Sequence, residues 1–285
     1  MIDVALASDG VTLDLSADDR LLREALGARG LSTAVLPWTN EAYDWSGVRC
    51  CVPRLAGQPP GPETARDYDH WLGRVREQTS LANPLRSMRW NLHARCLVDL
   101  AKKGVRSVDA ACFAQGARLD LGEELARRDA RRVAVRPAHR HAGRPVVFPR
   151  TRVKTAQRHL DGVLAVGDAA LVFDPPEDAP PGPTGRRSLV YLGGGFSHAV
   201  VHTGEGESGV DAAVPREDEV ELARAALALI PGEPCYARVD LVRDGEDRPL
   251  VADLDVVDGP LYFGWGEGAP DRLAGELFAR LAREA

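Results

Sequence analysis

Charged side chains at alternate positions mark two strand-like segments near the carboxyl end of the chain. The first segment carries Arg238 and Asp240, and the second carries Asp253 and Asp255. Because alternate residues of a β-strand lie on the same face, the two side chains of each segment point the same way. If the turn at residues 244–247 pairs the two strands, three carboxylates and one guanidinium converge on one face.

The combination of carboxylates with a guanidinium suggests a definite chemistry. Carboxylate oxygens are hard ligands that suit Mg²⁺, which proteins hold through a few carboxylates and the phosphates of a substrate. An adjacent arginine stabilises the charge of a phosphoryl group in transfer. The alternative is an exposed strand face with ordinary polar alternation. A solvent face more often mixes Lys, Arg, Thr and Ser among its acids, so the sequence favours a site for phosphoryl transfer.

The elements at the start of the chain predict a mixed α/β fold. Apolar, β-rich residues at 2–7 and 32–36 flank a segment at 18–28 with helical spacing, which is a β-α-β opening. A further strand is predicted at 47–52, and a helix is predicted at 63–78. These elements form an amino-terminal α/β domain.

A second amphipathic segment follows the break at Asn83-Pro84. Its spacing predicts one helix over residues 87–103, closed by Gly104 as a C-cap. Short strands and helices then alternate up to the proline-rich segment 179–183, which no regular element crosses. We expect an amino-terminal domain, a central region and a carboxyl-terminal lobe, with bounds at 1–86, 87–178 and 179–285. The later strands are predicted at 108–113, 132–136, 170–173, 187–192, 196–202, 236–242 and 250–257, and the later helices at 121–128, 155–166, 217–229 and 269–283.

The composition excludes several classes of function. The 285 residues include 36 basic and 42 acidic side chains, a net charge of −6, so bulk electrostatics does not draw the chain to nucleic acid or anionic lipid. No apolar run approaches the roughly 20 residues that span a bilayer, and the amino terminus lacks the pattern of a signal peptide. The five cysteines form no C-x-x-C pair and are expected to be reduced thiols. We expect a cytoplasmic protein without a nucleic-acid or membrane partner, and a homodimer is left open.

Several motifs, in the same order along the chain, resemble the ATP-grasp superfamily. They include the hairpin sequence at 188–200, the stretch Arg-Val-Asp-Leu-Val at 238–242, and an Asp-x-Asp pattern that begins 13 residues after Asp240. Asn83-Pro84 and Trp90-Asn91-Leu92 extend the likeness over most of the chain. The likeness is to actinobacterial ligases similar to glutathione synthetase and to the cycloserine-forming cyclo-ligase. It implies an ATP-grasp fold, in which an antiparallel carboxyl-terminal lobe faces a central lobe across a cleft.

The resemblance also implies an enzyme and its cofactors. Such proteins use ATP and Mg²⁺ to join a small-molecule carboxylate to an amine through an acyl phosphate, here in specialised metabolism. By that resemblance Asp240, Asp253 and Asp255 hold Mg²⁺. Arg238 is then the catalytic residue, in contact with the γ-phosphate. The implied nucleotide contacts are Arg136 for the α- and β-phosphates, the backbone of Leu171, Val172 and Phe173 for adenine, and Glu177 for the ribose.

Some positions depart from the family's pattern on the nucleotide side. Ala94 stands where relatives have a lysine that reaches ATP, and Arg136 replaces a second lysine. The loop at 138–144 has little of the glycine that lets backbone N–H groups approach phosphates. Arg186 or Arg187 stands where an acid is expected. These losses favour an alternative in which the chain is a degenerate ATP-grasp protein, a non-catalytic module that binds a small molecule or a partner.

Overall fold

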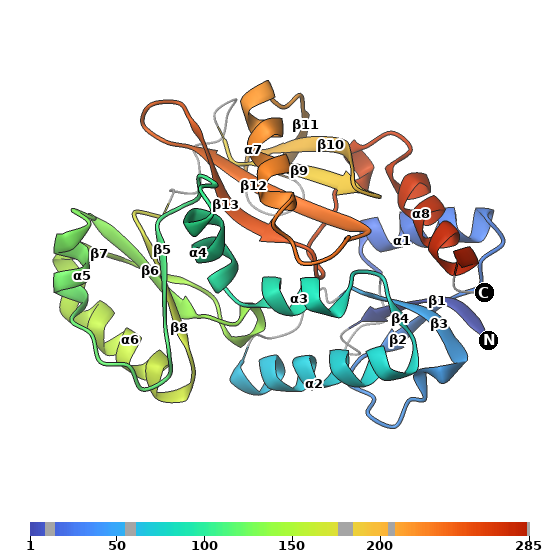
Figure 1. Ribbon diagram of the computed structural model, residues 1–285, viewed down its shortest axis with the longest axis horizontal. Helices are drawn as coiled ribbons and strands as arrows, with labels where there is room; N and C mark the ends of the chain where they lie inside the picture. The colour runs from blue at the N-terminus through green and yellow to red at the C-terminus, as the bar shows by residue number, and fades with distance from the viewer. Residues whose placement is uncertain (9–14, 55–60, 176–184, 205–208, 284–285) are drawn as a thin grey trace.

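The computed structural model describes the chain except for residues 9–14, 55–60, 176–184, 205–208 and 284–285. The strands form three sheets: a parallel sheet of four strands, an antiparallel sheet of four and an antiparallel sheet of five. Figure 1 shows the four-stranded antiparallel sheet at one end of the molecule, beside the other two. The predicted mixed α/β class is confirmed.

The parallel sheet, ordered β2-β1-β3-β4, confirms the β-α-β opening. Its central strand β1 is covered on both faces, which explains its continuous apolar run. Val4 and Leu6 pack on one side in the same cluster as helices α1 and α8, whereas Ala5 and Ala7 pack on the other side with helix α2. The bounds are β1 Ile2–Ser8, α1 Ala17–Ala28, β2 Thr33–Pro37, η1 Trp45–Gly47, β3 Val48–Pro53, α2 Pro62–Gln78, β4 Ser80–Leu81 and α8 Ala269–Arg283.

The four-stranded antiparallel sheet forms a central lobe with strand order β5-β8-β6-β7. One face is covered by helices α5 and α6, whose leucines pack with Val133, Val135 and Leu171. The edge strand β7 is not predicted from the sequence, because two of its valines are exposed and no apolar alternation marks it. The bounds are β5 Ala110–Phe113, α5 Leu121–Arg127, β6 Arg132–Pro137, η2 Arg140–Ala142, β7 Val146–Pro149, η3 Arg150–Arg152, α6 Val153–Val166 and β8 Ala169–Phe173.

The five-stranded sheet forms the carboxyl-terminal lobe with order β11-β10-β9-β12-β13. Gly193 and Gly194 both adopt positive φ angles and turn the chain between β9 and β10, as the glycine run predicts. Strand β11 pairs at the edge and is not predicted from the sequence. The bounds are β9 Arg187–Leu192, β10 Gly195–His202, β11 Val210–Ala213, α7 Glu217–Leu227, β12 Tyr236–Arg243, β13 Pro249–Asp255 and η5 Phe263–Trp265.

The single helix predicted over 87–103 is wrong. The structure has two helices, α3 at Leu85–Leu92 and α4 at Arg95–Lys102. His93 between them is extended and forms a β-bridge with His139, and the N–H of Ala94 donates to the carbonyl of Ala138 at 2.7 Å. The helical spacing continues through this point in the sequence, so the break arises from a tertiary contact with the central lobe.

Two asparagines bond the segment around α3 to the β12–β13 hairpin. Asn83 lies just before α3, and Asn91 lies within it. The amide of Asn83 donates to the carbonyls of Tyr236 and Val256 and accepts from the N–H of Cys235. The amide of Asn91 donates to the carbonyl of Leu254 at 2.6 Å and accepts from the N–H of Val256 at 3.0 Å. Both asparagines are buried, so these bonds fix the hairpin against this segment.

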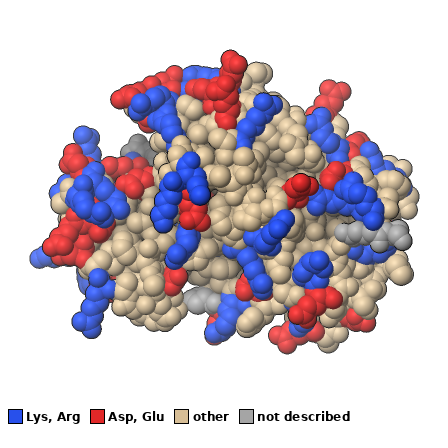
Figure 2. Space-filling model, in the orientation of Figure 1, with Lys and Arg blue, Asp and Glu red and all other residues tan. Residues whose placement is uncertain are grey.

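The surface and the helix lengths bear on the expected partners. On the face shown in Figure 2, basic and acidic side chains are intermixed, without a broad region of one sign. None of the helices in the described part of the chain combines the length and the hydropathy needed to span a bilayer.

Candidate active site

The paired strands β12 and β13 bring the predicted charged residues together. In the antiparallel register Arg238 lies opposite Asp255, and Asp240 lies opposite Asp253. Arg238, Asp240 and Asp255 are buried, whereas the side chain of Asp253 retains about a third of its exposure. The convergence expected from the alternating pattern is therefore present on one face of the hairpin.

Arg238 is held in a fixed orientation by its neighbours. Its Nε and Nη2 donate to the carboxylate of Asp240 at 3.0 and 3.3 Å, and its Nη1 donates to the carbonyl of Pro260 at 3.0 Å. Burial raises the pKa of Asp240, but the charges of Arg238 and Arg186 outweigh burial and leave that pKa below its usual value. The guanidinium and the carboxylate thus form a buried ion pair.

Arg140 was not predicted as a site residue, yet it lies between the two acids of β13. Its Nη1 donates to Asp253 at 3.2 Å and to Asp255 at 3.0 Å. Its Nη2 donates to Asp253 at 3.1 Å and to the carbonyl of Leu254 at 2.6 Å. Arg140 belongs to the glycine-poor loop of the central lobe, so this contact joins the central lobe to the hairpin of the carboxyl-terminal lobe. No local sequence signal indicates it.

The donor types suit Mg²⁺, but their arrangement does not fit a bound metal ion. Among the described residues, no three His, Cys, Asp or Glu side chains are placed to hold one ion together. Arg140 already occupies oxygens of Asp253 and Asp255. Burial raises the pKa of Asp255, but Arg140 and Arg238 hold it well below its usual range. The assignment of Mg²⁺ to Asp240, Asp253 and Asp255 stays a prediction.

A serine and a histidine complete the polar network around Asp240. Ser188 Oγ donates to Asp240 Oδ1 at 2.6 Å and lies 2.8 Å from His202 Nε2. Arg186 lies beside His202, with Nη2 3.5 Å from Nδ1. Sequence reasoning placed Arg186 where an acid was expected but did not connect Ser188 or His202 to the site. The pairing of β9 with β12, which sets Ser188 opposite Asp240, supplies that connection.

Gly259 leaves room for the charged groups at the end of the hairpin. A Cβ added at this position would lie 2.4 Å from Asp255 Oδ2 and 2.6 Å from Arg238 Nη1. Any larger residue would therefore displace the two side chains, and only glycine permits the backbone to approach them this closely. The carbonyl of Gly259 accepts from Arg54 Nη1 at 3.0 Å, which fixes this backbone against the amino-terminal domain.

The predicted nucleotide contacts lie on the central lobe. Arg136 ends β6 and, within the described part of the chain, forms no ion pair; its Nε donates to the carbonyl of Pro137 at 3.2 Å. Burial and the charge of Arg140 lower its pKa. The adenine residues Leu171, Val172 and Phe173 lie on the inner strand β8, which pairs with β5 and β6 on its two sides. Glu177 lies outside the described residues.

The missing lysine leaves an apolar contact. Ala94 packs with Ala138 and Ala170 in a small buried cluster beside Cys112. Ala94 therefore contributes packing at a position where relatives are expected to place a charge. The nucleotide assignments of Arg136 and of residues 171–173 stay predictions.

A second cluster of polar side chains lies where helix α2, the loop at η2 and the segment after β13 meet. Tyr68 of α2 contacts the ring of His141 in the loop, with ring centroids 4.8 Å apart. His141 Nε2 lies 3.4 Å from Asp258 Oδ2, just beyond the end of β13. Burial lowers the pKa of both His139 and His141 to about 4. Burial and the charge of Asp255 raise the pKa of Asp258 to about 7.

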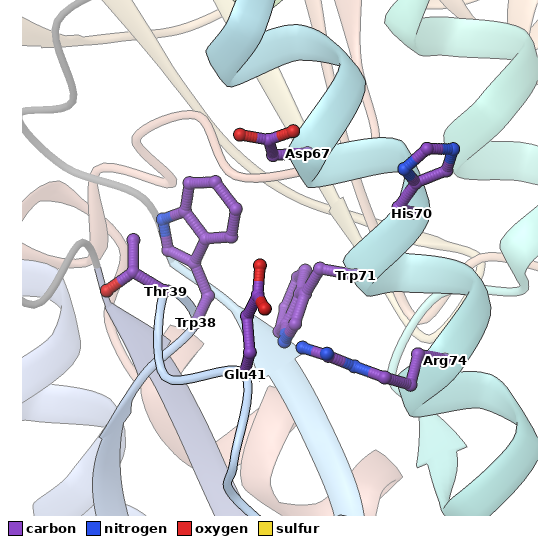
Figure 3. A pocket seen from close by; sticks show the side chains of 7 residues that line it. All are labelled: Trp38, Thr39, Glu41, Asp67, His70, Trp71 and Arg74. Atoms are coloured by element: carbon purple, nitrogen blue, oxygen red, sulfur yellow. The ribbon is translucent and has the colours of Figure 1, made fainter.

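A separate pocket of about 190 Å³ opens on the amino-terminal domain. Figure 3 shows Glu41 between the rings of Trp38 and Trp71, with Arg74 extending toward Trp71 from α2. Trp38 and Trp71 also contact Tyr68, with ring centroids 5.5 and 5.3 Å apart from it. None of the predicted site residues lines this pocket, so it is separate from the hairpin site.

Comparison with known proteins agrees with this architecture. Residues 4–83 match the family described as D-cycloserine synthetase DcsG, N-terminal domain. The cycloserine biosynthesis protein DcsG of Streptomyces lavendulae is 29% identical over 299 residues, which cover 98% of each chain. The crystal structure of D-cycloserine synthetase DcsG superposes with a TM-score of 0.84 at 28% identity, over 98% of this chain and 99% of that one. D-alanine–D-alanine ligase of Bacillus anthracis, solved with ATP, superposes at 0.65 with 12% identity, over 100% and 98%.

The fold and the comparisons define the class of protein. The two antiparallel lobes and the amino-terminal α/β domain are those of an ATP-grasp ligase, as the resemblance implied. The chain is similar to D-cycloserine synthetase DcsG over nearly its full length and shares the fold of the ATP-grasp ligases.

Proposed function

We propose that the chain joins a carboxylate to an amine through an acyl phosphate made from ATP, in the biosynthesis of a specialised small molecule. One observation carries the proposal: Arg238, Asp240, Asp253 and Asp255 lie together on one hairpin face, beside the central lobe, in a chain similar to D-cycloserine synthetase along 98% of its length. Such ligases need a cation near the phosphoryl group and acids beside it.

The first step forms the acyl phosphate. A carboxylate oxygen of the substrate attacks the γ-phosphorus of ATP, the bond from that phosphorus to the β–γ bridging oxygen breaks, and ADP leaves. Arg238, already oriented by Asp240 and Pro260, stabilises the negative charge on the phosphoryl oxygens. Arg136 holds the α- and β-phosphates, because its guanidinium is not committed to an acid in the described part of the chain.

The second step forms the new carbon–nitrogen bond. The amine nitrogen attacks the acyl carbon, the carbon–oxygen bond to phosphate breaks, and inorganic phosphate leaves while the nitrogen loses a proton. Arg238 lies beside Gly259 and stabilises the charge that develops on the acyl oxygen. The burial of this region excludes water, which would otherwise hydrolyse the acyl phosphate.

The precedent of a D-cycloserine synthetase suggests the kind of substrate. Cycloserine is a ring, and a ligase that closes a ring acts on one molecule that carries both the carboxylate and the amine. We therefore propose a small amino-acid derivative as the substrate class. The Mg²⁺ assignment belongs to the same proposal, and an ion bound by Asp253 and Asp255 must first displace Arg140.

The test is phosphate release with ATP, Mg²⁺ and a panel of D- and L-amino acids and their amino-oxy and amide derivatives. We expect release that depends on one family of substrates, and we expect Asp253→Asn to reduce it at least 100-fold. Asp211→Asn, an acid on the exposed part of β11, serves as the matched control and should retain activity. Absence of release across the panel contradicts the proposal and favours the non-catalytic binding module instead.

A further inference from the structure

The junction of the three parts of the chain contains buried polar atoms without hydrogen-bond partners. Among the described residues these atoms are Tyr68 Oη, His141 Nε2 and Asp258 Oδ2, together with His139 Nε2 and Arg140 Nε of the loop that carries His141. Tyr68 has no exposed surface, and the side chains of Asp258 and His141 retain 7% and 14% of theirs. Native proteins rarely leave buried polar groups unpaired, because each costs the free energy of its lost hydration. Tyr68, His141 and Asp258 lie together, and their unpaired atoms indicate that a polar group binds between them.

Of the acids in this region, Asp258 is the one whose carboxylate lacks a partner, as its three acidic neighbours show. Asp255 is held by Arg140, and its Oδ1 accepts from the backbone N–H of Val257 at 2.9 Å. Asp19 is held by Arg54 Nε at 2.5 Å, and Asp18 accepts three backbone N–H groups from residues 261–263. In the described structure, Oδ2 of Asp258 is the oxygen among these four acids that is buried and unpaired.

His141 does not serve as the hydrogen-bond partner of Asp258 Oδ2. The two atoms are 3.4 Å apart, but their geometry makes no hydrogen bond. In the tautomer of neutral His141 that leaves Nε2 unprotonated, Nε2 and Asp258 Oδ2 are both acceptors, and one donor group can bond to both. The loop that carries His141 is fixed from the other side by the N–H of Gly61, which donates to the His141 carbonyl at 2.9 Å.

We propose that Asp258, His141 and Tyr68 form a binding site for a primary ammonium group. Such a group carries one positive charge and three N–H donors. The carboxylate of Asp258 supplies the opposite charge and one acceptor, and the hydroxyl of Tyr68 and the imidazole of His141 supply the other two. The three side chains come from α2, from the loop at η2 and from the segment after β13, so the site forms only when the parts of the chain are assembled.

The position of this ammonium site suggests what it does in catalysis. That role depends on the ligase reaction proposed above. Asp258 directly precedes Gly259, whose backbone lies against Arg238 and Asp255. An ammonium group bound by Asp258 is therefore next to the place where the acyl phosphate forms. The site would recognise the amine end of the substrate, and Arg238 would act on its carboxylate end.

The test measures binding without turnover, with methylammonium as the probe. Thermal unfolding is followed at pH 8 in methylammonium chloride and in potassium chloride at equal ionic strength. A ligand that binds only the folded state raises the melting temperature. We expect a rise of at least 2 °C in methylammonium over potassium for the wild type, no rise for Asp258→Asn, and a rise smaller than half for Tyr68→Phe.

Two controls separate binding from general stability. Tyr68→Phe removes only an unpartnered hydroxyl, so without a ligand it should fold as well as the wild type or better. Asp129→Asn changes a fully exposed carboxylate and should keep the full methylammonium effect. An equal effect in the wild type and in Asp258→Asn, or no effect in the wild type, overturns the ammonium site. If the effect is present but no substrate releases phosphate, the proposed ligase reaction fails and the ammonium site remains.

Discussion

Asp255 and Asp258 lie three residues apart, yet their pKa values move in opposite directions. Burial raises the pKa of each carboxyl group. At Asp255 the charges of Arg140 and Arg238 outweigh burial, whereas at Asp258 the charges of Arg140, Arg54 and Arg238 do not. Burial and the nearby charge of Asp255 raise the pKa of Asp258 to about 7. The position of a few guanidinium groups therefore decides which carboxylates of the site are ionised at neutral pH.

The buried loop histidine His139 makes the free energy of unfolding depend on pH. Burial lowers the pKa of His139 to about 4, whereas an unfolded histidine titrates near 6.5. Between these values the unfolded chain binds more protons, so the free energy of unfolding falls as the pH is lowered. His139→Asn removes this titration, and its side-chain oxygen still accepts from the N–H of His141, as Nδ1 does at 3.2 Å. Between pH 7.5 and pH 5 we expect the wild type to lose about 2 kcal/mol more than the variant.

Urea unfolding at the two pH values measures this difference. Asp258 titrates in both proteins, and its raised pKa acts in the opposite direction, so its contribution cancels in the comparison. His70→Asn, at an exposed position on α2, serves as the control and should show the wild-type pH dependence. Equal pH dependence in the wild type and in His139→Asn would show that His139 is protonated alike in the folded and unfolded chains.

At the residue scale, the sequence predicts which side chains of one strand share a face. Alternation within β12 and β13 indicates that Arg238, Asp240 and Asp255 share a face, and the register confirms it. Arg140 and Asp258 could not be assigned in the same way. Arg140 reaches the acids from more than 110 residues away, and its role depends on the fold of a loop whose composition indicates only a lack of glycine.

At the element scale, the loop that contains η2 acts through Arg140. Arg140 takes up oxygens of Asp253 and Asp255 that a divalent cation would need. Arg140→Gln removes this competing charge from both acids, and Asp255 keeps only the more distant Arg238, at 3.8 Å. We expect the nucleotide-free variant to bind Mn²⁺ at least tenfold more tightly than the wild type, because the ion and the guanidinium exclude each other. Electron paramagnetic resonance of free Mn²⁺ measures the affinity directly.

The same loop supplies the control for that measurement. Arg144→Gln removes an equal charge at an exposed position and should leave Mn²⁺ affinity unchanged. Because the measurement is made without nucleotide and without turnover, it reports on the acids alone. Equal affinity in the wild type and Arg140→Gln would mean that Arg140 does not compete for these oxygens in solution.

Element prediction succeeds where local pattern decides and fails where tertiary contact decides. Strands β1, β2 and β3 of the amino-terminal sheet and both strands of the β12–β13 hairpin lie within a residue or two of their predicted bounds, because burial imposes the apolar pattern that identifies them, whereas the two-residue strand β4 is not predicted. The break between α3 and α4 follows from the bridge of His93 to His139 in another lobe. The apolar pattern of residues 87–103 does not indicate the contact with His139.

At the scale of the whole molecule, the amino-terminal and carboxyl-terminal parts stabilise one another. One apolar cluster contains residues of β1, α1, β9, β12 and α8. Asn83 adds hydrogen bonds from the end of the amino-terminal domain to both strands of the hairpin region. We expect Asn83→Ala to lower the free energy of unfolding by about 2 to 4 kcal/mol, because three buried backbone groups lose their partner.

Two probes test whether this loss is shared across the molecule. Three of the five tryptophans, Trp38, Trp45 and Trp71, lie in the core of the amino-terminal domain, so tryptophan fluorescence is weighted toward that domain, and far-ultraviolet circular dichroism reports on all three sheets. We expect both urea transitions to shift together in Asn83→Ala. Asn40→Ala, at an exposed position, should change neither midpoint by more than a few tenths of a molar. Separate transitions for the two probes would contradict the shared core.

The packing of α8 against α1 constrains how the chain reaches this fold during synthesis. Leu22 and Leu26 of α1 share their core with Leu273 and Leu277 of α8, which the ribosome makes about 250 residues later. At about 5 to 20 residues per second, α1 waits roughly 10 to 50 s for that partner. Through this interval α1 of the nascent chain has an uncovered leucine face, and chaperones that bind such faces have their longest opportunity here.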